Sequence, residues 1–135
     1  MTAVIDASAL AALVADLGDE GRWVLAAVGN EPLAGPHLVL AEASNVLRRI
    51  ERRGHISNAE ADEAYRQLAE ATVSLYPFSP FAERVWELRH NLTAYDAWYV
   101  ALAESLDCPL VTLDVRLSRA PGPGCAFIAP PSEDG

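Results

Sequence analysis

The stretch that most constrains the fold runs from Thr93 to Leu106 and reads TAYDAWYVALAESL. Between Ala94 and Ala103 its side chains are apolar or aromatic on almost every side, with Asp96 as the single charge. A helix without a polar face has to be buried inside the protein. A buried carboxylate is costly unless a cation or a hydrogen-bond donor lies beside it. Asp96 therefore has either a local structural role, three residues after the helix cap Thr93, or a functional one.

Around this stretch, short apolar strands alternate with helices. The sequence predicts strands at residues 2–6, 72–76, 109–113 and 125–129, and a further short strand within 31–36. It predicts helices at residues 8–17, 19–28, 38–53, 57–71, 80–92, 93–107 and 115–119. The strands are continuous apolar runs, which is typical of a parallel sheet covered by helices on both faces. We therefore expect an α/β protein of three layers, α/β/α, with a central, mostly parallel sheet.

The length of 135 residues and the apolar fraction of 51% fit one globular domain. We expect this domain to span residues 1–129 and the remaining residues, 130–135, to form a frayed tail. No apolar run reaches the ~18 residues that a membrane span requires. The N-terminus also lacks the basic segment of a signal peptide. The sequence therefore predicts a cytoplasmic protein with no membrane partner.

The charge balance argues against broad contact with nucleic acid. The net charge is −9, and all ten cationic side chains are arginines. An overall acidic field repels a phosphate backbone. Arg48, Arg49, Arg52 and Arg53 nevertheless cluster, and helical spacing makes them a basic strip beside Glu42. This strip is either a solvated helix face or a local contact for phosphate groups.

Four carboxylates occupy comparable positions, at the end of a predicted strand or beside the apolar face of a predicted helix: Asp6, Glu42, Asp96 and Asp114. Parallel sheets bind ligands at the carboxyl ends of their strands, so Asp6 and Asp114 can share one crevice. Each acid also has a purely structural alternative, as a helix cap or as the partner of an arginine. Clustered carboxylates repel one another, and Mg²⁺ or Mn²⁺ is the usual counter-charge for oxygen ligands. Two such ions can activate water for phosphodiester hydrolysis.

Four blocks that carry these acids resemble the PIN-domain ribonucleases, and more closely the VapC toxins of bacterial toxin–antitoxin pairs. The blocks are VIDASAL, AEASNVL, YDAWYVALA and TLDVRL, and together they extend over nearly the whole chain. The resemblance implies a set of catalytic acids that coordinate Mg²⁺ or Mn²⁺ for RNA hydrolysis: Asp6, Glu42, Asp96 and Asp114. It implies supporting polar roles for Ser8, Asn45 and Thr112.

On this resemblance we expect a metal-dependent endoribonuclease that acts as the toxin of a type II toxin–antitoxin pair. The partners it implies are an RNA substrate, a cognate VapB-type antitoxin and a second copy of the chain in a homodimer. The antitoxin of such pairs commonly lies in a groove near the site and points an arginine into it. Candidates for RNA contact are Arg49 and Arg53 on the basic strip and Arg116 in the last block. The alternative is a catalytically silent PIN-like module that binds a protein partner.

Other active-site patterns are missing from the sequence. It contains no Walker A motif, no G-x-G-x-x-G and no G-x-S-x-G. Its three histidines lack the spacing of zinc ligands, and we expect them at the surface or in satisfied positions. Cys108 and Cys125 form no CxxC pair, and both lie at predicted strand starts, where a small buried thiol is expected.

Overall fold

The computed structural model describes residues 2–16 and 18–131. A five-stranded sheet, in the order β3-β2-β1-β4-β5, forms its centre, and every adjacent pair of strands is parallel. The strands are β1 (Ala3–Ile5), β2 (Leu33–Pro36), β3 (Val73–Tyr76), β4 (Leu110–Val111) and β5 (Phe127–Ile128). The helices are α1 (Ala7–Ala15), α2 (Asp19–Val28), α3 (Val39–Arg52), α4 (Asn58–Glu70), α5 (Ala82–Glu87), α6 (Ala94–Leu106) and α7 (Val115–Ser118).

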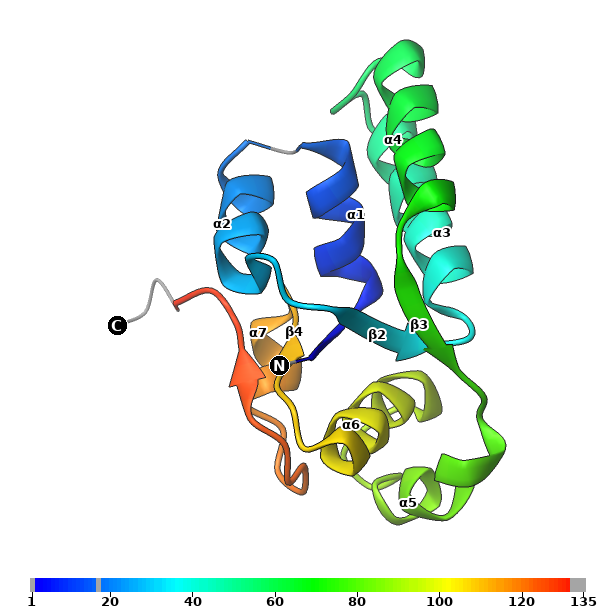
Figure 1. Ribbon diagram of the computed structural model, residues 1–135, viewed down its shortest axis with the longest axis vertical. Coiled ribbons are helices and arrows are strands. Elements are labelled where there is room, and N and C mark those ends of the chain that lie inside the picture. The colour runs from blue at the N-terminus through cyan, green and yellow to red at the C-terminus, as the bar shows by residue number, and fades with distance from the viewer. Residues whose placement is uncertain (1, 17, 132–135) are drawn as a thin grey trace.

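Helices cover both faces of the sheet (Figure 1). Helices α1 to α4 lie on one side of it, and α5 and α6 lie on the other. The predicted three-layer α/β architecture is therefore confirmed, with a sheet that is wholly parallel. The layers follow from the apolar strands, because a strand that is hydrophobic on both sides needs cover on both faces.

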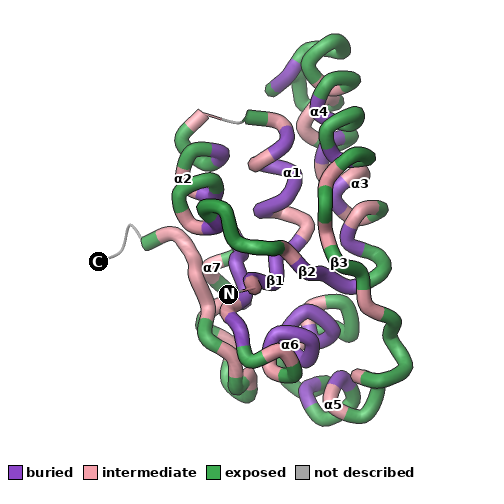
Figure 2. The backbone as a smooth tube through the Cα atoms, viewed as in Figure 1, coloured by how far each residue is buried: buried purple, intermediate pink, exposed green. Residues whose placement is uncertain are grey.

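The core is built around β1 and α6. All three residues of β1 are buried, and β1 lies in the middle of the sheet. Residues Ala97–Ala103 of α6 are buried without interruption, as the purple tube in Figure 2 shows. The prediction of a buried helix is confirmed for this stretch. Its first turn is at the surface, where Tyr95 is 59% exposed, and this position leaves Asp96 at the border between core and solvent.

Two predicted helix boundaries are wrong. The first helix ends at Ala15, where Asp16 takes the left-handed conformation (φ 52°) and donates its N–H to the carbonyl of Ala12. The predicted helix extends to residue 17, which lies outside the described residues, and Gly18 is the N-cap of α2. Aspartate tolerates the left-handed region because its short polar side chain bonds locally.

The helix predicted at residues 80–92 is also shorter than expected. A 3₁₀ turn, η1 (Ser79–Phe81), precedes α5, which ends at Glu87. After that point the Arg89 side chain donates to the carbonyl of Trp86 (2.8 Å), and the backbone N–H of Arg89 bonds to the same oxygen (3.2 Å). Trp86 therefore does not offer that carbonyl to a continuing α-helix, and the chain turns toward Thr93.

The ends of the chain bear on two other predictions. Of the predicted tail, only residues 130 and 131 are described, and residues 132–135 lie outside the described part. The single domain at residues 1–129 stays a prediction. No helix in the described part of the chain is long and apolar enough to cross a membrane.

Candidate metal centre

Asp6 follows β1 directly and is the N-cap of α1. Its Oδ1 accepts hydrogen bonds from the Ala9 N–H (3.0 Å) and the Ser8 hydroxyl (2.7 Å), and its Oδ2 accepts one from the Thr112 hydroxyl. The residue is only 8% exposed. Burial raises the pKa of Asp6, the three hydrogen bonds oppose the rise, and the charge of Asp114 adds to it. Asp6 therefore caps a helix, which was its structural alternative, and also lies at the end of a strand, as its functional role requires.

Asp114 reaches the same edge from the neighbouring strand, since β1 and β4 pair in parallel. It is the N-cap of α7, and its Oδ1 accepts from the Leu117 N–H (3.1 Å). Thr112 connects the two acids, because its hydroxyl donates to Asp6 and accepts from the Asp114 N–H (2.9 Å). The expectation that Asp6 and Asp114 share one crevice follows from this pairing of adjacent strands.

Asp96 and Glu42 come from helices on opposite faces of the sheet. On α6, the Asp96 N–H donates to the Thr93 hydroxyl (3.2 Å), which is half of a capping box. Burial, followed by the charges of Asp114 and Asp6, raises the pKa of Asp96, while Thr93 and Arg116 lower it.

Glu42 lies in the first turn of α3, and its Oε1 accepts a hydrogen bond from the Tyr99 hydroxyl (2.8 Å). Burial raises the pKa of Glu42, the bond from Tyr99 opposes this rise, and the charges of Asp96 and Asp6 add to it. Burial and the nearby carboxylates in turn raise the pKa of Tyr99. The phenol therefore stays protonated and acts as the hydrogen-bond donor to Glu42.

All four acids line one cavity of about 250 Å³. The remaining lining residues include three that were predicted to take part in the site, Ser8, Asn45 and Arg49, together with Ala7, Val46 and Tyr99. Thr112 does not line this cavity, but its hydroxyl donates to the Asp6 carboxylate. Tyr99 is not among the predicted site residues. Its spacing of three residues from Asp96 indicates the same helix face and could have identified it.

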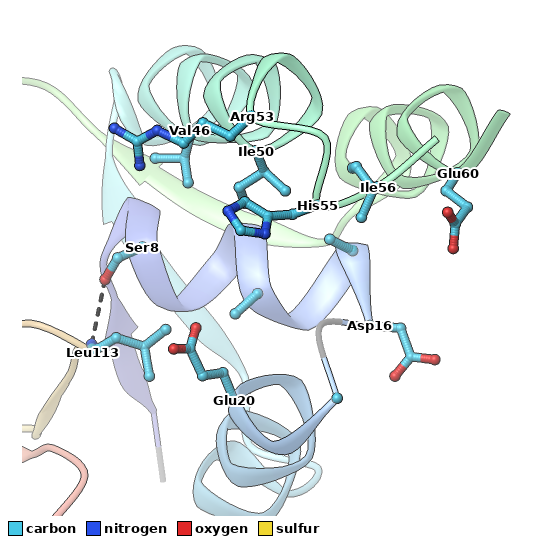
Figure 3. Close-up of a pocket in the computed structure, with 13 residues that line it drawn as sticks. Ser8, Asp16, Glu20, Val46, Ile50, Arg53, His55, Ile56, Glu60 and Leu113 are labelled. Atoms are coloured by element: carbon cyan, nitrogen blue, oxygen red, sulfur yellow. Dashed lines mark hydrogen bonds between the residues drawn. The ribbon is translucent and has the colours of Figure 1, made fainter. Parts of the chain in front are cut away.

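The other candidate arginines lie in cavities on either side. Arg116 lines a cavity of about 120 Å³ that shares Asp96 and Asp114 with the acidic one. Arg53 lines a larger cavity of about 710 Å³, which shares Ser8 and Val46 with the acidic one. Figure 3 shows this larger cavity between α1 and α3, with Leu113 donating its N–H to Ser8 (3.3 Å) at one end.

The donor set fits a hard divalent cation. Four carboxylates border one small space, and burial, to which their mutual charges add, raises the pKa of three of them. Mg²⁺ and Mn²⁺ prefer such oxygen ligands. Within residues 2–16 and 18–131, no group of three His, Cys, Asp or Glu side chains is arranged to hold an ion directly. Mg²⁺ in proteins usually keeps several waters, so this spread of carboxylates remains compatible with binding.

The histidines and cysteines lie away from the four acids. His37, His55 and His90 are exposed. Cys108 is buried and Cys125 is partly buried, and both are free thiols. None of these five side chains borders the acids.

The family model described as PIN domain matches residues 3–123, which include the whole sheet up to β4 and all four acids. The chain belongs to this family and, within it, to the VapC ribonucleases. It is 44% identical over 129 residues to ribonuclease VapC9 of Mycobacterium tuberculosis, covering 95% of this chain and 98% of that protein. The family predicted from the four sequence blocks is therefore confirmed.

Solved structures agree on the fold. PAE2754 from Pyrobaculum aerophilum is 28% identical, with a TM-score of 0.65 and coverage of 94% of this chain and 83% of that one. VapBC2 from Rickettsia felis, bound to a DNA fragment from its promoter, is 15% identical, with a TM-score of 0.63 and coverage of 96% and 98%. At that identity, the second likeness concerns the fold alone.

Proposed function

We propose that this protein is a metal-dependent endoribonuclease that acts in the cytoplasm as the toxin of a type II toxin–antitoxin pair. The observation that carries the proposal is the single cavity lined by Asp6, Glu42, Asp96 and Asp114. Membership of the VapC ribonucleases supports RNA as the substrate. Mg²⁺ or Mn²⁺ is the cofactor that this set of oxygen donors favours.

Asp6, Asp96 and Asp114, with help from Glu42, would hold the ion. When bound, the ion supplies Lewis acidity that activates water and stabilises charge on the phosphodiester. The protein itself supplies pre-organised ligands. Hydrogen bonds from Ser8, Ala9 and Thr112 fix the Asp6 carboxylate, so it does not have to reorganise when the substrate arrives.

Arginines on both sides of the acids would hold the RNA backbone. Arg49 borders the acids themselves, and Arg116 and Arg53 line the two adjoining cavities. None of these three side chains forms an ion pair with another described residue. Their guanidinium groups are therefore free to donate to phosphate oxygens. Such local contacts would allow a chain of net charge −9 to engage RNA.

Two surfaces of this protein suit the proposed protein partners. The 710 Å³ cavity, which adjoins the acidic one at Ser8 and Val46, presents the apolar side chains of Val46, Ile50 and Ile56. It would take an apolar segment of a VapB-type antitoxin, with an arginine reaching the carboxylates. Phe78 and Trp86 are 41% and 67% exposed, which suits burial against a second copy in a homodimer.

The test replaces single carboxylates with the isosteric amide. Asp6→Asn and Asp96→Asn are each expected to lower Mn²⁺-dependent cleavage of structured RNA more than about 100-fold, since even outer-shell partners of a metal cost 10–100-fold. EDTA is expected to suppress wild-type cleavage. Asp62→Asn makes the same charge change on an exposed part of α4 and is expected to leave cleavage unchanged. Cleavage at the wild-type rate in both site variants would contradict the proposal, and partner binding without any cleavage by the wild type would favour the silent module.

A further inference from the structure

Glu42 is held differently from two of the other acids. Asp6 and Asp114 cap helices, so backbone N–H groups fix their carboxylates. Glu42 lies in the first turn of α3 on a longer side chain, and the hydrogen bond that holds it comes from the Tyr99 hydroxyl (2.8 Å). A glutamate has more rotatable bonds than an aspartate, so its carboxylate needs a specific partner to keep one orientation.

Tyr99 is well placed to supply that orientation. The residue is only 3% exposed, so the core fixes its ring while its hydroxyl reaches the acidic cavity. A phenol bonded to an ionised carboxylate acts as the donor, because the carboxylate can only accept. One oxygen of Glu42 is thereby occupied, and the other is left for a ligand.

The same contact joins two helices from opposite faces of the sheet. Among the residues that the structure describes, it is the only side-chain hydrogen bond between α3 and α6. Asp96 and Tyr99 lie three residues apart on α6 and therefore share a helix face. Helix α6 thus provides one acid of the site directly and supports a second acid from another layer.

We propose that Tyr99 is the positioning residue of this site, which orients Glu42 so that its second oxygen faces the cation. This inference rests on the proposed metal-dependent function. Outer-shell donors orient metal ligands in this manner, and their loss typically costs 10–100-fold in metal affinity or activity.

The test removes only the hydroxyl. Tyr99→Phe keeps the buried ring, and calorimetric titration with Mn²⁺ is expected to show affinity weakened about 10- to 100-fold. RNA cleavage at low Mn²⁺ is expected to fall in proportion and to recover as the Mn²⁺ concentration rises, because all four carboxylates remain. A merely structural role would not move the metal dependence in this way. Tyr95→Phe, at an exposed position of the same helix, is the matched control and is expected to bind Mn²⁺ like the wild type.

A double-mutant cycle identifies the residue through which Tyr99 acts. Glu42→Ala removes the acceptor, so adding Tyr99→Phe to it is expected to weaken Mn²⁺ binding no further. Wild-type affinity and metal dependence in Tyr99→Phe would overturn the inference, and so would losses that simply add in the double variant. A wild-type protein that neither binds Mn²⁺ nor cleaves RNA would instead refute the metal-dependent function and Tyr99's role with it.

Discussion

At the scale of single residues, the proposed site gives the same carboxylates both a structural and a chemical use. Asp6 begins a helix and borders the acidic cavity, and Asp114 does the same one strand away. The two uses are compatible because a cap engages one carboxylate oxygen, and Asp114 uses only Oδ1 for its cap. The cost falls on the metal-free protein, in which several negative charges lie close together and partly buried.

Measuring the stability of the metal-free protein tests whether these buried charges cost folding free energy. Because the pKa of Asp6 is raised on folding, its contribution to stability is complete below its ordinary value of 3.8 and is lost as the pH rises through the folded value. At pH 7 with EDTA, Asp6→Asn is therefore expected to be more stable than the wild type by roughly 1 kcal/mol. The difference is expected to vanish at acidic pH, as urea unfolding at several pH values would show.

Adding Mn²⁺ is expected to reverse that order. A ligand at one hundred times its Kd stabilises the folded state by about 2.7 kcal/mol, and the wild type alone should gain it. Thermal unfolding with and without Mn²⁺ provides the measurement. A metal-free Asp6→Asn protein that is less stable than the wild type at pH 7 would mean that Asp6 is not strained by burial.

At the scale of elements, α6 is anchored at both ends. Its first turn carries the site, and near its last turn Glu104 receives the Arg84 guanidinium through Nε (2.8 Å) and Nη2 (3.0 Å). Arg84 also donates to the carbonyl of Gly122 (3.0 Å), and Glu104 accepts from the N–H of Gly124 (2.6 Å). This network joins α5, α6 and the loop that leads to β5.

Glu104→Ala is expected to destabilise the protein by about 2 kcal/mol, since hydrogen bonds to charged groups are worth ~1.5–3 kcal/mol. Arg84 and the Gly124 N–H both hold the pKa of Glu104 below its ordinary value of 4.5. The stabilisation is therefore present above pH 4.5 and lost as the pH falls through the folded value. Denaturant unfolding provides the measurement.

Arg22→Ala is the control for that experiment. It breaks a pair with Asp19 whose side chains are 69% and 97% exposed, and such pairs contribute ~0–1 kcal/mol. Equal effects of the two substitutions would contradict the role given to Glu104.

At the scale of the whole molecule, charge decides how RNA is bound. A net charge of −9 disfavours binding through the overall field, so the proposed contacts with phosphates are a few arginines beside the acids. With three such contacts to single-stranded RNA, log K is expected to fall against log salt with a slope of about −2.

The salt dependence of RNA binding can show which individual arginines contact phosphate. Arg116→Ala is expected to reduce its magnitude by about 0.7, measured by RNA binding in an Asp6→Asn background that prevents cleavage. Arg66→Ala, on α4 and paired with Glu63, is expected to leave the slope unchanged. An equal reduction by both substitutions would point to the overall field of the protein rather than to contacts at the site.

Most of the fold could be predicted from local patterns. The apolar strands, the helix that follows Ser57 and the buried helix after Thr93 each depend on residues close together in the chain. One predicted helix end was wrong because the Arg89 side chain competes for the carbonyl of Trp86. Such competition depends on rotamers and neighbours that a periodic pattern does not contain.

What the sequence by itself determined was the parallel α/β architecture and the presence of acids at strand ends, because continuous apolar runs, their alternation with helices and the residues that follow them are local patterns. Only the tertiary structure decided that Thr112 bridges two acids, that Tyr99 holds Glu42, and that Arg53 and Arg116 lie in separate cavities. The physical reason is that these contacts join residues far apart in the chain. A hydrogen bond requires donor and acceptor within about 3 Å, which depends on how the helices and strands pack.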